Sequence, residues 1–133
     1  MKTIILSALL FWVSTFSLAQ NVKISSIDHV QVLNNNLEEA VYYYQNNWKV
    51  LREMALEKDY IDSFQFLENT DANNSTDSTD IILITTFGDS VQFSKREKHF
   101  EELISIKGPL QLMNDKKPGE FRKTLKSQDF VNR

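Results

Sequence analysis

The chain has 133 residues, with 18 acidic and 15 basic side chains and no cysteine. Its net charge of −3 argues against a nucleic-acid partner, because proteins that bind nucleic acid concentrate Lys and Arg on one surface. The lack of cysteine excludes disulfides, thiol catalysis, cysteine-ligated metals and a lipoprotein anchor.

The first 19 residues have the three-part layout of a secretory signal peptide. Lys2 precedes an apolar run over residues 4–13, and the small residues Ser17 and Ala19 stand at the −3 and −1 positions before Gln20. The apolar run is much shorter than the roughly 20 residues needed to cross a bilayer. We therefore expect cleavage between Ala19 and Gln20. The protein would be exported, periplasmic or secreted, with no membrane anchor after cleavage.

Residues 20–133 are long enough for one domain and too short for two. Residues 21–25 are expected to be a disordered lead, and residues 26–33 are β-branched and roughly alternating, which is typical of a strand. Three Asn residues at 34–36 break this strand and offer an N-cap. Residues 37–59 then carry apolar side chains at steps of three and four, which predicts a helix with one buried face. These side chains are Leu37, Val41, Tyr44, Trp48, Leu51 and Ala55.

Two further strands are predicted over residues 60–68 and 80–87. The first places Phe64 and Phe66 on one face, and the second is apolar on both faces, which is typical of the middle of a sheet. Residues 69–79 contain almost nothing to bury, so they predict a solvated loop.

A second helix is predicted after residue 88, with Asp89 as its N-cap and Gly108 at its end. Its expected inward side chains are Phe93, Phe100, Leu103 and Ile104. Beyond a turn at 117–119, residues 121–125 are expected to form a short fourth strand.

The order βαββαβ predicts an α+β, ferredoxin-like domain over residues 20–133. In that fold one antiparallel sheet carries two helices on a single face. Val30 and Val32 would then lie under the helices, which leaves the open face to Ile27, His29, Gln31 and Leu33. A half-apolar open face favours a homodimer in which two sheets close face to face.

Several segments resemble the dimeric α/β-barrel superfamily, which includes antibiotic-biosynthesis monooxygenase-like, stress-responsive barrel and NIPSNAP-like proteins. The residues concerned are the Tyr run 42–44 with Trp48, residues 60–64, residues 81–85 and Phe87. The neighbourhoods 47–49 and 83–85 also resemble a set of short exported proteins from Bacteroidetes-type bacteria. The resemblance spans about residues 26–125 and implies a dimeric α/β barrel. It implies no single activity, since the fold hosts enzymes and ligand binders alike.

The candidate ligand-binding residues are His29, Gln31, Tyr44 and Trp48. A histidine pointing into a barrel interior can act as a base or ligand near neutral pH, although a hydrogen-bonded interface histidine is the simpler interpretation. Aromatic side chains at helical spacing can line a cavity, but they more often form core. His99 is expected to be solvated, and no spacing of the two histidines predicts a metal site.

We therefore expect an exported dimeric domain without enzymatic activity or cofactor, either structural or binding a small apolar or aromatic ligand. The alternative is a cofactor-independent monooxygenase or a heme-handling enzyme. Heme-degrading relatives use an Asn, a Trp and a His around the porphyrin. This chain has Trp48 and His99 on predicted helices, but the first strand offers His29 and Gln31 rather than Asn, so the match is partial.

Overall fold

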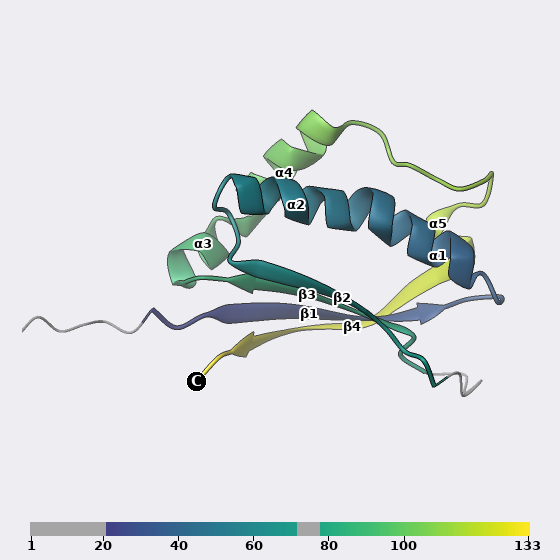
Figure 1. The fold of residues 1–133 in the computed structure, drawn as a ribbon, viewed down its shortest axis with the longest axis horizontal. Helices are drawn as coiled ribbons and strands as arrows, with labels where there is room; N and C mark the ends of the chain where they lie inside the picture. Colours follow the sequence, from purple (N-terminus) through teal and green to yellow (C-terminus); the bar gives the residue numbers. More distant parts are fainter. Residues whose placement is uncertain (1–20, 72–77) are drawn as a thin grey trace, which may run out of the picture.

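The fold is described from a computed structural model, which describes residues 21–71 and 78–133. A four-stranded antiparallel sheet with strand order β2-β3-β1-β4 carries the described helices on one side (Figure 1). This is the predicted ferredoxin-like α+β fold. The predicted signal peptide, with its cleavage site between Ala19 and Gln20, lies outside the described residues.

The strands are β1 (Ile24–Val32), β2 (Ser63–Glu68), β3 (Ile81–Phe87) and β4 (Arg122–Val131). As predicted, the strand that is apolar on both faces, β3, lies inside the sheet, between β2 and β1. The expected disordered lead over residues 21–25 is wrong at its end. Ile24 pairs with both Phe87 and Val131, and the buried Ser25 shares a hydroxyl hydrogen bond of 2.9 Å with Thr86.

The predicted long helix is one continuous run made of three parts: α1 (Leu37–Tyr43), the π-helical turn η1 (Tyr44–Trp48) and α2 (Lys49–Glu57). The π-turn surrounds the buried Asn47, whose amide donates 2.8 Å hydrogen bonds to the carbonyls of Tyr43 and Gln111. Its Oδ1 accepts from Lys107 at 2.7 Å and from the Gln111 N–H at 2.8 Å. Asn47 therefore fastens the segment after residue 107 to the helix.

The second predicted helix is divided into α3 (Ser90–Ser94) and α4 (Arg96–Lys107). Asp89 caps it as expected, since its Oδ1 accepts from the Gln92 N–H at 2.8 Å. Gly108 ends α4 at φ 83° and ψ −152°, a conformation that glycine alone adopts readily. Leu103 is buried, but Ile104 is exposed, which corrects its expected inward position.

The last strand is twice as long as the five residues expected. After one turn of helix, α5 (Pro118–Phe121), the ten-residue β4 pairs with β1 along its whole length, with a bulge at Leu125 opposite His29 and Val30. Most β4 side chains are polar and exposed, because β4 is an edge strand. That polarity hid the strand from the sequence pattern.

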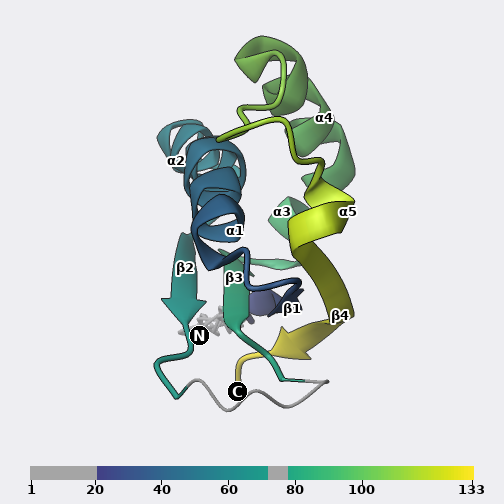
Figure 2. The same cartoon turned by 90° about the vertical axis from the view of Figure 1, so that its right-hand side faces the viewer.

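Two apolar clusters fill the space between helices and sheet. The first joins Val30 of β1 and Leu83 of β3 to side chains of α1, η1 and α5. The second joins Phe87 to Ala55 of α2 and Leu103 of α4. The run α1–α2 lies above β2 and β3, whereas α5 stands above β4 (Figure 2).

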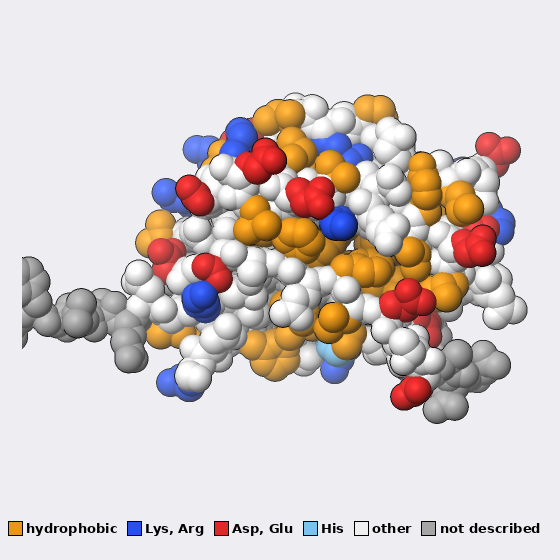
Figure 3. Space-filling model, in the orientation of Figure 1, with side chains coloured by type: hydrophobic (Ala, Val, Ile, Leu, Met, Phe, Trp, Pro, Cys, Tyr) orange, Lys and Arg blue, Asp and Glu red, His pale blue; other side chains and the backbone are white. Residues whose placement is uncertain are grey.

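The opposite face of the sheet is open. Because Val30 is buried under the helices and side chains alternate along a strand, His29 and Gln31 point to the open face. Partly exposed Ile27, Ile82 and Ile84 share this face with Leu67 and Phe130, which are 44% and 46% exposed. Apolar side chains are visible along the lower border of the molecule in Figure 3. Within the described residues, no helix is long and apolar enough to span a membrane.

Candidate functional site

The most unusual side chain in the described structure is Arg52 of α2. Its Nε donates a 3.1 Å hydrogen bond to Oγ1 of Thr85 on β3. Its guanidinium carbon lies 4.5 Å from the ring centroid of Trp48 and 4.4 Å from that of Phe100. These contacts hold the planar cation against two aromatic rings, where it is stabilised by the ring electrons.

Arg52 has no carboxylate in ion-pair contact anywhere in the described part of the chain. Burial lowers the pKa of its guanidinium to about 10, and the nearby Asp28 carboxylate acts in the opposite direction. The side chain is still charged at neutral pH. A partly desolvated cation that makes no ion-pair contact can bind the anionic group of a ligand.

The cavity beside Arg52 has a volume of about 380 Å³ and lies between α2, α4 and the sheet. Its polar lining comes from β1, β3 and the start of α4, and its apolar lining comes from both helices and the end of β3. The lining residues are Ser26, Asp28, Leu51, Arg52, Thr85, Phe87, Arg96, Glu97, Phe100 and Ile104. We call this cavity the Arg52 cleft.

The sheet beside the cleft is polar, although it faces the helices. The Ser127 hydroxyl donates to Oδ1 of Asp28 at 2.5 Å, and the Ser26 hydroxyl donates to Oδ1 of Asp129 at 2.6 Å. The apolar helix run lies instead over β2 and β3 (Figure 2). The β1–β4 half of the sheet can therefore contact a polar ligand.

Arg96 holds the second guanidinium of the cleft in place. Its Nη1 donates to the Phe93 carbonyl at 2.9 Å, and its guanidinium carbon lies 4.0 Å from the Phe93 ring centroid.

The four predicted ligand-binding residues do not form one site. His29 and Gln31 lie on the open face, whereas Tyr44 and Trp48 are buried on the helix side of the sheet. The sheet itself separates the two pairs. Of the four, Trp48 alone contacts Arg52.

His29 lines a separate pocket of about 400 Å³ at one end of the open face, where Nδ1 is 3.5 Å from Oγ1 of Thr79. His99 is not simply solvated as expected. It stacks on Tyr60 with ring centroids 3.6 Å apart and planes 8° from parallel.

The residues do not fit a heme site. Trp48 is buried between helix and sheet, His29 lies beyond the sheet and His99 stacks on Tyr60, so the three do not surround one cavity. No group of three His, Cys, Asp or Glu side chains suited to a metal occurs among residues 21–71 and 78–133.

Arg52 and Asp28 are not among the site residues predicted from the sequence, although both stand out in its pattern. Arg52 stands four residues after Trp48 and one after Leu51, so a cation interrupts the apolar side of the helix. Asp28 lies on the same side of its strand as the core residue Val30. A charged residue on a predicted buried face is the pattern that would have indicated the cleft.

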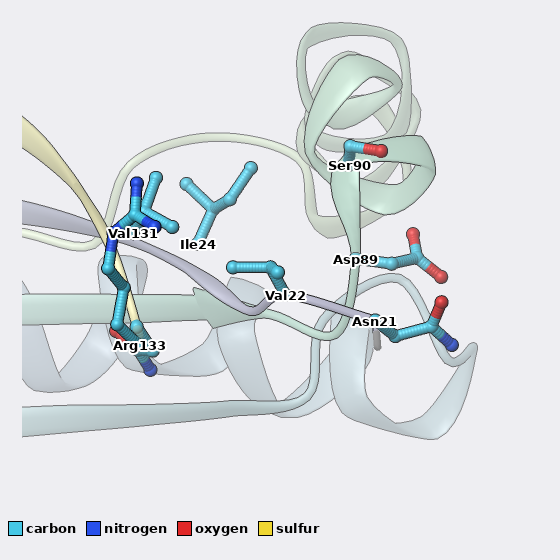
Figure 4. A pocket seen from close by; sticks show the side chains of 8 residues that line it. Asn21, Val22, Ile24, Asp89, Ser90, Val131 and Arg133 are labelled. Atoms are coloured by element: carbon cyan, nitrogen blue, oxygen red, sulfur yellow. The ribbon is translucent and has the colours of Figure 1, made fainter. Parts of the chain in front are cut away.

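Another hollow, of about 850 Å³, lies at the end of the sheet where residues 21–24, 89–90 and 131–133 meet. Asp89 and Arg133 lie on opposite sides of it (Figure 4). Asp89 is already engaged in capping α3. Because its charged groups do not converge, we do not place the site there.

The known proteins to which this chain is similar are distant ones. No protein-family model matches it, and no curated protein is significantly similar to it. Among solved structures it is similar to MupZ from Pseudomonas fluorescens, with a TM-score of 0.47 and 13% identity, over 82% of this chain and 71% of that chain. It is also similar to a dimeric ferredoxin-like protein of unknown function from Thermobifida fusca, with a TM-score of 0.49 and 12% identity, over 85% of this chain and 93% of that chain. Neither likeness transfers a role, so the candidate site rests on the geometry of the cleft.

Proposed function

We propose that this protein is an exported, homodimeric, non-enzymatic domain that binds a small molecule with a carboxylate group and an aromatic or large aliphatic body. The observation that carries the proposal is the guanidinium of Arg52, which faces a cavity without an ion-pair partner among the described residues. A carboxylate would receive charge-assisted hydrogen bonds from its Nη atoms. The sequence carries no catalytic motif, which favours binding over turnover.

The walls of the Arg52 cleft favour an apolar ligand body. Leu51, Phe87, Phe100 and Ile104 contribute apolar or aromatic surface, and Ile104 is 55% exposed on the cleft side of α4. The volume of about 380 Å³ is within the roughly 300–1,000 Å³ range of small-molecule sites.

Calorimetric titration with 3-phenylpropionate and with the uncharged 3-phenylpropanol tests this proposal. We expect the acid to bind more tightly than the alcohol. The variant Arg52→Met keeps an unbranched apolar stem and removes the guanidinium with its charge, so it should weaken binding of the acid about ten- to a hundredfold.

Lys49→Gln is the matched control, because Lys49 is an exposed cation in the same helix and pairs only with Glu53 on the surface. It should leave binding of the acid unchanged. The anion site would be ruled out if the acid and the alcohol bound equally tightly, or if Arg52→Met and Lys49→Gln lost the same affinity for the acid.

The homodimer is proposed from the open face of the sheet. Ile27, Ile82 and Ile84 form its centre, and no described segment covers them. A second copy of the same face supplies a complementary apolar surface by two-fold symmetry.

Export is proposed from residues 1–19 and agrees with the resemblance to exported proteins of Bacteroidetes-type bacteria. Expression of the full chain in a bacterial host, followed by periplasmic fractionation and intact-mass measurement, tests it. The expected product begins at Gln20. Full-length protein retained in the cytoplasm would contradict it.

An enzyme of the cofactor-independent monooxygenase kind is the second candidate. The Asp28 carboxylate favours it, because a base beside a cation can generate and hold an anionic intermediate. Oxygen uptake with hydroquinones, abolished in Asp28→Asn, would support the enzyme. Ligand binding without oxygen uptake would support the binding protein.

A further inference from the structure

The Arg52 cleft contains negative groups as well as positive ones. Its lining includes the cations Arg52 and Arg96 and the anions Asp28 and Glu97. Burial lowers the pKa of the Arg52 guanidinium and the charge of Asp28 partly opposes this effect, yet the two side chains form no ion pair. Opposite charges that face one cavity without touching leave room for a ligand that contacts both.

Both groups keep hydrogen-bonding capacity toward such a ligand. Asp28 accepts one hydrogen bond, from Ser127 through Oδ1, which leaves Oδ2 as an acceptor. Arg52 uses Nε for Thr85, which leaves its two terminal nitrogens as donors. The Thr85 hydroxyl accepts that bond and can donate its own hydrogen to a ligand carboxylate.

The two pairs of opposite charges in the lining balance each other, so the cleft as a whole carries no net charge. Such a site favours a zwitterion over a simple anion, because each ligand charge meets its opposite in a partly desolvated space. The apolar walls described above then surround an uncharged ligand body.

We propose that the Arg52 cleft binds a free α-amino acid with a large apolar or aromatic side chain, with the carboxylate on Arg52 and the ammonium group on Asp28. This inference rests on the proposed function and narrows its ligand class. An α-amino acid presents both charged groups on one carbon, which suits a carboxylate and a guanidinium that line one cavity. Its side chain would lie against Phe100 and Ile104.

Three ligands with the same phenyl group separate the contributions: L-phenylalanine, 3-phenylpropionate and 2-phenylethylamine. Calorimetry on the purified protein should show L-phenylalanine binding about tenfold or more tightly than either analogue, each of which lacks one charged group. Asp28→Asn should reduce L-phenylalanine to the affinity of 3-phenylpropionate. Arg52→Met should reduce it to the affinity of 2-phenylethylamine.

The results of these titrations distinguish amino-acid binding from the binding of a carboxylate on Arg52 alone. If 3-phenylpropionate binds through Arg52 and L-phenylalanine binds no more tightly, the amino-acid inference is wrong and the anion site remains. If neither acid binds, both are wrong. Because the ligand series is measured on the unmodified protein, the result does not depend on the variants folding, and Lys49→Gln controls for a general change of charge.

Discussion

Tyr44 shows how a single buried residue ties stability to pH. Burial raises the pKa of its phenol to about 12, from an ordinary value of 10. The folded state therefore keeps a proton that the unfolded chain releases between these two values. The resulting stabilisation is complete below pH 10 and is lost as the pH rises through about 12.

Tyr44→Phe should remove this alkaline loss of stability. Urea unfolding at pH 8 and at pH 11.5 should show a decrease for the native protein that exceeds that of the variant by roughly 2 kcal/mol. The lowered pKa of Arg52 acts in the opposite direction in this range, but it is common to both proteins and cancels. Tyr42→Phe, outside the buried core, is the matched control. An identical pH dependence in all three proteins would contradict the assignment.

The candidate site could be predicted from the sequence only in part. Alternation placed His29 on the open face, and helical spacing placed Trp48 against the sheet; both placements are confirmed. Neither pattern could show that Arg52 meets Phe100, because that contact joins two helices 48 residues apart. A contact of this kind depends on how the helices cross the sheet.

At the scale of elements, the π-turn and the segment after α4 form one unit. Asn46 and Asn47 each donate an amide hydrogen bond of 2.8 Å to the carbonyl four residues earlier. Asn47 alone also reaches Gln111 and Lys107. The extra bonds attach the start of the segment 108–116 to the helix, while Asn114 and Lys116 attach its end to Glu39.

Asn47→Ala should therefore destabilise the protein by about 2–4 kcal/mol, since it leaves buried polar groups unpaired. Asn46→Ala, which loses only the local bond, should cost less than about 1 kcal/mol. Urea unfolding measures both. Hydrogen exchange should accelerate over residues 108–116 in the first variant only. An equal loss of stability in the two variants would show that the hydrogen bonds from Asn47 to Gln111 and Lys107 contribute nothing.

Two glycines, Gly108 at the end of α4 and Gly119 in α5, differ in how much stability a substitution by alanine should cost. Gly108 has φ 83° with open space around it, so a substitution there meets backbone strain and no steric contact. Gly119 also has open space but lies in the helical turn α5. Gly108→Ala should cost about 1–3 kcal/mol. Gly119→Ala should be neutral or stabilising by up to about 1 kcal/mol. Thermal unfolding of both variants checks this, and equal midpoints would contradict it.

At the scale of the whole molecule, the helices protect one face of the sheet and leave the other unprotected. Leu67 and Phe130 remain 44% and 46% exposed at the two edges of that open face, on β2 and β4. An apolar sheet face of this extent is typical of an interface.

Ile84→Lys should therefore convert the proposed dimer into a monomer. Light scattering at micromolar concentration should give twice the chain mass for the native protein and one chain mass for the variant. Val91→Lys places the same charge at an exposed apolar position on α3 and should leave the dimer intact. A monomeric native protein would overturn the barrel-like assembly.

The sequence by itself determined the order of elements, the buried and open faces of β1, and the Asp89 cap and Gly108 end of the second predicted helix, because each follows from local spacing and backbone preference. The Asn36 side chain at the start of α1 makes no capping hydrogen bond and instead contacts Glu120 and Lys116. The signal peptide with its expected cleavage before Gln20 remains a prediction from the sequence alone. Only the tertiary structure decided the length of β4, since a polar edge strand is defined by its partner and has no apolar pattern of its own. The Arg52 cleft also depends on the tertiary structure. Its charges come from strands and helices far apart in the chain, and packing alone brings them to one cavity.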